Sequence, residues 1–559
     1  MLFFSLASLL SGCGGDRASQ KRFPSKQDID RLIQKPAPRF QERKVIEVDH
    51  WDLAGPFPNM VGTRTYVDSS GWGRVLKEVA DAKPGVLVPT EAMHCVAREL
   101  GLFYLANRST PSEDLGDYIM GRCGSPTVGL SWQMVSGDVG GHAEEDVFRR
   151  WRGDYEEMLR EQGSGNRAIG SFYGKRDGHA VVLVASAARA VHVEDTSPFP
   201  DAEGRVWLRG ELLVPAESID ALVNQGHYRV APCSVDASVS LPRFAVACPT
   251  SPEDQRAWIE LAAFPSGRVL GRTVLQVLAW PNKAPTSQYV NETYTAPRSL
   301  AVGEDKTAAL LELINQARAT AGLAAVSLST KQSVTATRVA PHFFAALFGD
   351  EQETVADTVV LGLQAGWDIE GLVKKGMFTY GLTFQADDLA RMIDRVVARP
   401  RGRKVLLDPE ITQMAIGPLD VADRPVLASV FSGYVLFGQE DNNKNAHLVR
   451  ERLNKLRAEK NLPPLGVLAS VQAKANAAAA QVAKGAKNPS QVFDDLLRES
   501  ARIIEDGVTG WVFYASSLED YEFPAKFVEL KSGRIAISVA QFRADDEPWG
   551  QHVIFVVID

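Results

Sequence analysis

The sequence predicts an α+β chain of several modules, in which one pattern of helices and strands occurs three times and an all-β segment is inserted. Three observations support this prediction. A helical segment with an Asn-x-x-Arg motif occurs twice, strand-like runs follow each occurrence, and residues 201–297 hold short β-rich runs separated by turns. A length of 559 residues allows several domains, at roughly 150 residues each.

The repeat is clearest in the second half of the chain. In residues 308–334, apolar residues at helical spacing surround Asn315-x-x-Arg318 and are followed by a Gly-Leu pair. Residues 448–471 repeat this order around an Asn-x-x-Arg motif that begins at Asn454. The pattern predicts one kind of module used twice.

The residues that end the two predicted helices support the match. Gly322 and Asn461 each stand just past the helix, where a left-handed cap is needed and where Gly and Asn tolerate positive φ. We therefore predict module 2 over residues 298–438 and module 3 over residues 439–559.

A fainter third occurrence lies upstream. Leu87 and Met93 keep the six-residue step found between the loop and second helix of the other copies. A late strand with an Ala-Ile start follows at residue 168, and Asp177-Gly178 predicts a tight hairpin after it. These features predict module 1 over residues 71–200. The β-rich runs of residues 201–297 predict a β-sandwich module.

The repeats resemble the CAP, or SCP-like, domain family of cysteine-rich secretory and pathogenesis-related proteins. The likeness rests on the Asn-x-x-Arg helix, the turn at Gly322, the apolar second helix and the late Ile416-Gly417 strand. The segment Leu462-Pro-Pro-Leu is also similar to the family's post-helix segment. The resemblance implies tandem α-β-α sandwiches, with the all-β sandwich inserted between modules 1 and 2.

Family members with the full pattern hold a divalent metal with two His and two Glu. Module 2 departs from that pattern, because Gly402 stands where a His belongs and Tyr380 stands where a Glu is expected. His342 is the single histidine of module 2, and His447 and His552 of module 3 lie far from the motif positions. The sequence therefore predicts neither a metal site nor a cofactor.

The N-terminus resembles that of a bacterial lipoprotein. An apolar run in residues 1–12 is too short to span a membrane, which takes ~20 residues, and is typical of a signal peptide. It ends in Leu-Ser-Gly before Cys13, which resembles a lipobox and implies lipidation of Cys13 and attachment to a membrane. Gly14, in place of an Asp that retains lipoproteins at the inner membrane, favours the outer membrane or the cell surface.

Residues 13–70 are predicted to carry the lipid and form a tether. Between residues 14 and 44, nine Lys or Arg stand against four Asp or Glu, with few apolar residues. The positive charge would favour anionic headgroups, and a solvated linker without a specific partner is the simpler interpretation. The net charge of the whole chain is -8, which argues against nucleic acid as a partner.

Four cysteines remain besides Cys13, and an even number in an exported chain is typical of disulfides. Neighbourhood favours the pairs Cys95 with Cys123 and Cys233 with Cys248, while the sequence leaves the connectivity open.

A competing interpretation of module 1 is catalytic. The order of Cys95, His179 and Asp195 resembles that of papain-like peptidases, in which a Cys at a helix N-terminus is activated by an imidazole. Against this, Cys95 falls within an apolar helical pattern and Cys123 is available to pair with it. His142 with Glu144 and Glu145 could also form a metal cluster, but a solvated helix start is the simpler interpretation.

The leading hypothesis is an envelope lipoprotein whose modules bind a protein, a lipid or the cell wall without catalysis. The alternatives are a cysteine hydrolase that uses Cys95 and His179, and a structural spacer of the cell envelope.

Overall fold

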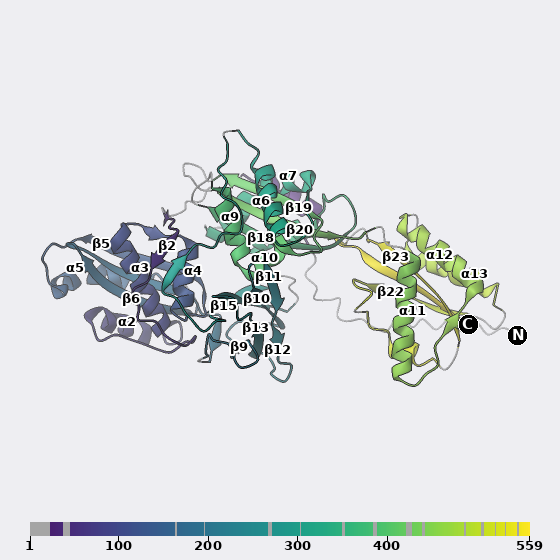
Figure 1. Ribbon diagram of the computed structural model, residues 1–559, viewed down its shortest axis with the longest axis horizontal. Coiled ribbons are helices and arrows are strands. Elements are labelled where there is room, and N and C mark those ends of the chain that lie inside the picture. Colours follow the sequence, from purple (N-terminus) through teal and green to yellow (C-terminus); the bar gives the residue numbers. More distant parts are fainter. Residues whose placement is uncertain are drawn as a thin grey trace.

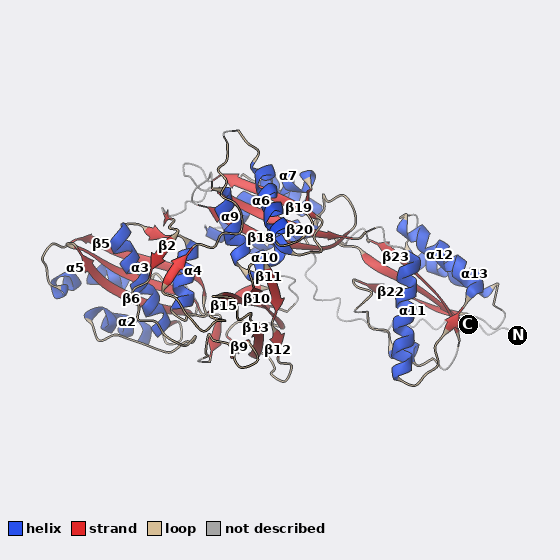
Figure 2. Cartoon of the chain, viewed as in Figure 1, coloured by secondary structure: helices blue, strands red, loops and turns tan. Residues whose placement is uncertain are grey.

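The computed structural model describes most of the chain and shows the predicted α+β architecture (Figures 1 and 2). The described residues are 23–36, 45–162, 165–194, 196–266, 271–301, 303–348, 353–383, 388–420, 427–438, 442–485, 488–504, 508–519, 521–530, 533–544 and 547–559. Cys13 and Asp195 lie outside them. Within these ranges, no helix is both long enough and apolar enough to cross a membrane.

Module 1 is a four-stranded sheet covered by helices on both faces. Its strands are β3 (Leu87–Pro89), β5 (Val128–Asp138), β6 (Arg167–Arg176) and β7 (His179–Ala188), in the order β3-β6-β7-β5. Its helices are α2 (Gly71–Asp81), α3 (Glu91–Asn107), α4 (Glu113–Arg122) and α5 (Glu144–Arg160). Strand β3 runs parallel to β6, and the other pairs are antiparallel. Asp177 and Gly178 both adopt positive φ in the β6–β7 turn, which confirms the predicted hairpin.

Modules 2 and 3 repeat this strand order. The strands of module 2 are β17 (Ser327–Leu328), β18 (Val373–Thr383), β19 (Gln413–Asp420) and β20 (Leu427–Leu436), in the order β17-β19-β20-β18. Those of module 3 are β21 (Gly466–Val467), β22 (Thr509–Ala515), β23 (Arg534–Phe542) and β24 (Gln551–Ile558), in the order β21-β23-β24-β22. In all three modules, the short first strand is parallel to the third and every other pairing is antiparallel.

The helices of modules 2 and 3 follow the same sequence of elements. Module 2 contains α6 (Lys306–Thr320), α7 (Thr330–Phe348), α8 (Glu353–Ala365), α9 (Leu389–Ala398) and α10 (Pro400–Leu407). Module 3 contains α11 (Asn442–Glu459), α12 (Ala469–Ala483), α13 (Pro489–Ala501) and α14 (Ala525–Val528). Each sheet has one core on either face: α6, α9 and α10 enclose one core of module 2, and α7 and α8 enclose the other. The result is three layers, because alternate side chains of a strand point to opposite faces.

The Asn-x-x-Arg motif has the same structural role in both clear copies. The side chain of Asn315 accepts the Val326 N–H at 2.9 Å, and that of Asn454 accepts the Leu465 N–H at 2.9 Å. The buried guanidinium of Arg318 donates to backbone carbonyls, including Ala324 at 2.8 Å. Arg457 is also fully buried and likewise donates to backbone carbonyls. The motif therefore fixes the conformation of the loop that follows the first helix. Gly322 and Asn461 both adopt the predicted positive φ.

A β-sandwich follows module 1. One sheet has the order β11-β10-β14-β15 and the other β12-β13-β9-β8, and apolar residues of both sheets share one core. Its strands are β8 (Val191–Val193), β9 (Arg205–Leu212), β10 (Ser218–Gln225), β11 (Arg229–Pro232), β12 (Ser234–Val235), β13 (Arg243–Pro249), β14 (Ala257–Phe264) and β15 (Arg272–Ala279). Strand β8 joins this sandwich although it precedes residue 201, where the sequence places the boundary.

Part of the segment that the sequence assigns to a tether is folded against the modules. Helix α1 (Lys26–Ile33) buries Ile29 and Leu32 against α7 and α8 of module 2. Two short strands follow: β1 (Val45–Ile46) pairs with β4 (Thr110–Pro111), and β2 (His50–Asp52) pairs with β16 (Gln288–Val290). The sequence does not predict α1 because most residues around it are charged or polar. Its amphipathic character rests on Ile29 and Leu32, two apolar residues three positions apart.

A row of arginines on α9 and α10 joins module 2 to its neighbours. Arg395 pairs with Asp114 of α4 and, at 2.9 Å, with Glu47. Arg399 donates to Asp117 of α4 at 2.6 Å. The Asp117 side chain is 33% exposed, and its partial burial raises its pKa even though the Arg399 charge opposes the shift. Figure 1 shows module 1 and the β-sandwich beside module 2, with module 3 at the far end of the chain.

Candidate functional site

The predicted catalytic cysteine is half of a disulfide. Cys95 on α3 is bonded to Cys123 at the end of α4, and Cys233 is bonded to Cys248 in the sandwich core. These are the two pairs that proximity in the sequence favours. While the bond is intact, Cys95 has no thiol that could act as a nucleophile.

His179 is engaged elsewhere. It begins β7, and its Nδ1 lies 2.8 Å from Oδ1 of Asp138, its partner at the end of β5. The Asp138 side chain is 92% exposed, so the pair lies at the edge of the sheet. Asp195, the third residue of the catalytic interpretation, lies outside the described residues.

Thiol titration separates the disulfide from the hydrolase interpretation. We expect a chain carrying Cys13→Ser to show no free thiol in denaturant before reduction and four thiols after it. Cys95→Ser should lower the free energy of unfolding by about 3–4 kcal/mol, because the bond closes a loop across a separation of 28 residues. A free thiol at Cys95 in the oxidised chain would contradict this and support the hydrolase.

At Gly402, where the resemblance implies a histidine, there is no room for a side chain. A Cβ atom on Gly402 would lie 2.2 Å from the backbone oxygen of Val396, so any side chain there requires the backbone to move. Tyr380 occupies the expected Glu position and packs against Phe343, with ring centroids 5.3 Å apart. The residues present therefore do not fit the family's metal.

The same holds elsewhere in the described part of the chain. There, no group of three or more His, Cys, Asp and Glu side chains is placed to hold a metal ion. The Nδ1 atom of His142 lies 2.6 Å from the backbone oxygen of Val139.

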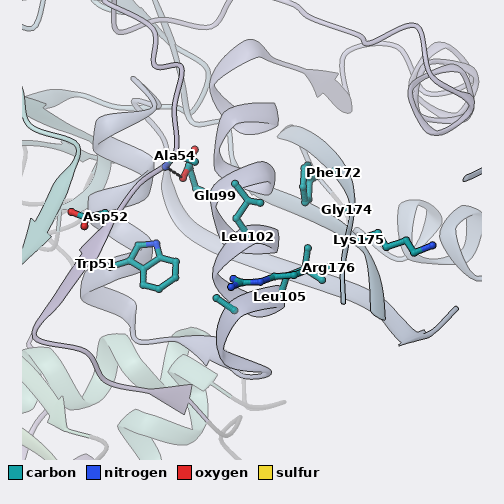
Figure 3. Close-up of a pocket in the computed structure, with 11 residues that line it drawn as sticks. Trp51, Asp52, Ala54, Glu99, Leu102, Leu105, Phe172, Gly174, Lys175 and Arg176 are labelled. Atoms are coloured by element: carbon teal, nitrogen blue, oxygen red, sulfur yellow. Dashed lines mark hydrogen bonds between the residues drawn. The ribbon is translucent and has the colours of Figure 1, made fainter. Parts of the chain in front are cut away.

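A pocket of about 420 Å³ in module 1 is the stronger candidate (Figure 3). It lies between α3, β6 and the segment that includes β2, and this volume is in the range of small-molecule sites. Trp51, Leu102, Leu105 and Phe172 provide apolar surface. In Figure 3, the Arg176 side chain extends toward Trp51, whereas that of Lys175 points away.

Contacts with β16 and α3 fix the position of Trp51. The residue pairs with Tyr289 in the β2–β16 ladder, and its ring packs edge-on against Phe103 of α3 at 4.8 Å. Glu99 fixes the backbone just after Trp51, because its carboxylate accepts the N–H groups of Ala54 at 2.8 Å and Gly55 at 3.1 Å. The indole is therefore preorganised before any ligand arrives.

Phe172 is held by two glycines. A Cβ on Gly101 would lie 2.3 Å from the Phe172 ring, and a Cβ on Gly174 would lie 2.6 Å from it. Because neither residue carries a side chain, the ring fits between helix α3 and its own strand, which forms one side of the pocket.

Glu99 and Arg176 differ in how well protein partners compensate their charges. Glu99 is 1% exposed and also accepts two hydrogen bonds from Arg98, at 2.8 and 3.1 Å, so its charge is compensated. The Arg176 side chain is 60% exposed, and its ion pair with Asp177 at 3.6 Å lies in solvent, where such pairs contribute about 0–1 kcal/mol. The guanidinium is therefore available to an anionic group placed above the apolar surface.

The sequence patterns do not predict this pocket. They predict the hairpin at Asp177-Gly178, which follows Arg176 directly, but the partner surface comes from β2, in the predicted tether. The apolar and aromatic residues around Trp51 indicate that this segment packs against the protein, because a solvated linker does not need them.

No protein-family model matches the chain, and no curated protein matches its sequence. A cysteine-rich secretory protein from Staphylococcus aureus is 12% identical, with a TM-score of 0.18, over 48% of this chain and 85% of that one. An extracellular protein containing an SCP domain from Bacillus anthracis is 11% identical, with a TM-score of 0.18, over 54% of this chain and 94% of that one. These weak structural neighbours are CAP/SCP proteins.

Proposed function

We propose that the chain is an exported bacterial lipoprotein that binds, without catalysis, a small ligand with an anionic group and an apolar part. The observation that carries this proposal is the Arg176 guanidinium beside the preorganised apolar surface of Trp51 and Phe172. The lipid on Cys13 would hold the protein at a membrane, and the CAP-like modules would act as a binding scaffold. Two disulfides support an oxidising compartment such as the cell envelope.

The pocket supplies two kinds of recognition. Burying apolar ligand surface contributes about 25 cal/mol per Å², and the fixed indole costs little additional ordering. A hydrogen-bonded ion pair at Arg176, whose side chain is 60% exposed, would add about 0–1 kcal/mol and would orient the ligand, because a planar guanidinium matches a carboxylate or a similar anion. Together these terms favour an amphipathic anion over a purely apolar or purely charged molecule.

Titration with anilinonaphthalene sulfonate, an apolar anion, tests the pocket directly. We expect the Cys13→Ser chain to bind the probe and Arg176→Glu to weaken the interaction at least about tenfold, since the substitution reverses the local charge. Trp51→Ala should also weaken it, by removing apolar surface.

Arg149→Glu serves as the matched control. Arg149 lies on α5 of the same module, its side chain is 77% exposed, and it does not line the pocket. If Arg149→Glu and Arg176→Glu change the affinity equally, the probe binds elsewhere and the proposal fails.

A further inference from the structure

The long edge strands of the chain differ in how they are protected from pairing with another chain. Among the described residues, four strands of more than five residues lie at sheet edges: β5, β15, β18 and β22. An edge strand presents backbone N–H and C=O groups that can pair with a further strand, and proteins block such edges by several means. Three of these edges carry a feature that blocks pairing, and β22 of module 3 does not.

The edge strands of modules 1 and 2 are irregular. The register of β5 shifts between Val128 and Ser131, and that of β18 shifts between Val373 and Lys375. A bulge bends and twists an edge strand, so a further strand cannot pair along its length. Lysine on an edge strand, as at Lys374 and Lys375 of β18, has the same effect.

Two of the edges also donate or accept hydrogen bonds within the chain. The Leu382 carbonyl of β18 accepts the Arg395 guanidinium at 3.0 Å. The Gln276 N–H of β15 donates to the Pro126 carbonyl, just before β5, at 3.2 Å. Contacts between modules therefore occupy these two edges.

Strand β22 has neither kind of protection in the part of the chain that the structure describes. Its seven residues, Thr-Gly-Trp-Val-Phe-Tyr-Ala, include no charged residue and no proline. Its register with β24 is regular from Thr509 to Ala515. Of the described strands, only β24 pairs with it, so β22 forms an open edge of the module 3 sheet (Figure 1).

The order of side chains along β22 suits pairing with a second copy of the same strand. In an antiparallel pair centred on Val512, each Val512 faces its own copy and each Trp511 faces a Phe513. Tyr514 is 44% exposed and faces Gly510, so the two tyrosine rings do not collide. Aromatic cross-strand pairs stabilise a sheet, whereas like charges directly opposite each other destabilise it, and this pairing brings no charges together.

We propose that two copies of the chain associate through antiparallel β22 strands, with the two-fold axis at Val512. The pairing joins two four-stranded sheets into one continuous sheet. Such an interface is self-complementary, because each contact occurs twice. One pair of strands buries less surface than a standard protein interface, so we expect a dissociation constant on the order of 10 µM. This surface is independent of the pocket in module 1.

Sedimentation velocity of the Cys13→Ser chain, from about 1 to 200 µM, tests the association. We expect the monomer to convert to a dimer over this range. Val512→Lys should raise the dissociation constant at least about tenfold, because two like charges would face each other across the axis. Val467→Lys is the matched control, since Val467 is 46% exposed on β21, at the opposite edge of the same sheet. A monomer at every concentration, or equal effects of the two substitutions, overturns the proposal.

Disulfide trapping tests the register without a charged variant. We expect Val512→Cys, in the Cys13→Ser chain, to give a covalent dimer on non-reducing gels. Opposite Cα atoms of antiparallel strands lie about 4.5–5.5 Å apart, within the reach of a disulfide. Thr509→Cys should give none, because the two copies of Thr509 would lie about 20 Å apart in this register, at about 3.4 Å per residue. Equal yields from the two variants, or a covalent dimer from neither, contradict the pairing.

Discussion

Replacing Arg395 with methionine is expected to lower the free energy of unfolding by about 3–5 kcal/mol, because it breaks a buried network of ion pairs. Asp114 would lose the Arg395 charge, and Glu47 would keep only Arg391, at 3.0 Å. The Arg395 side chain is 8% exposed and the Glu47 side chain 2% exposed. Burial opposes the charge of Arg395, but Asp114 and Glu47 outweigh it and raise the Arg395 pKa. The guanidinium also donates to the Leu382 carbonyl at 3.0 Å.

Guanidinium chloride unfolding, followed by fluorescence, measures this effect. The transition that reports on modules 1 and 2 should shift, while that of module 3 should not, because Arg395 links only the former. Arg498→Met is the control, since Arg498 is 72% exposed and forms a surface pair with Asp495 that is worth less than about 1 kcal/mol. Equal shifts for the two variants would show that the arginine row contributes little to the junction.

Replacing Arg318 with methionine should cost a similar amount, about 3–5 kcal/mol, for a different reason. Arg318 is fully buried, and its donors reach the carbonyls of Ala324, Leu406, Asp408 and Ile411. Methionine fills much of the same space but leaves several of these carbonyls without a donor. Module 2 should therefore lose stability through unsatisfied acceptors rather than through a cavity.

The equivalent substitution in module 3 supplies an internal comparison. Arg457 donates to the carbonyls of Pro463 and Val528, and its second terminal nitrogen is buried without a partner. We expect Arg457→Met to cost less than Arg318→Met, at about 2–3 kcal/mol. The reverse order in the unfolding transitions of the two modules would contradict this explanation of the motif.

The Asn-x-x-Arg motif shows why much of the fold can be predicted from the sequence. Asn315 and Arg318 act on a loop only a few residues away, and Gly322 adopts the positive φ that its position requires. Local requirements of this kind leave a pattern that repeats whenever the module repeats. The hairpin at Asp177-Gly178 is predictable for the same reason.

Contacts between distant segments leave no such pattern. Strand β2 pairs with β16 more than two hundred residues later, and α1 packs on module 2 across a similar separation. The β2–β16 pairing positions Trp51 and so creates the candidate pocket. A three-residue strand shows too little alternation of apolar and polar residues to predict which strand it pairs with. The pocket therefore could not be derived from the sequence.

The family resemblance also gains a physical explanation at one position. The sequence indicates only that Gly402 replaces a histidine. The structure adds that the Val396 backbone oxygen occupies the space that a side chain would need, next to the arginines that join module 2 to the rest of the chain. This segment joins module 2 to module 1 and the β-sandwich.

Ligand binding is tested most directly by co-sedimentation of the Cys13→Ser chain with separated envelope fractions: cell-wall sacculi, membrane lipids and envelope proteins. We expect one fraction to retain the chain, Arg149→Glu to be retained equally, and Arg176→Glu to remain in the supernatant. Retention of Arg176→Glu at the wild-type level, or retention of the wild-type chain by no fraction, would contradict a ligand-binding role for the pocket of module 1.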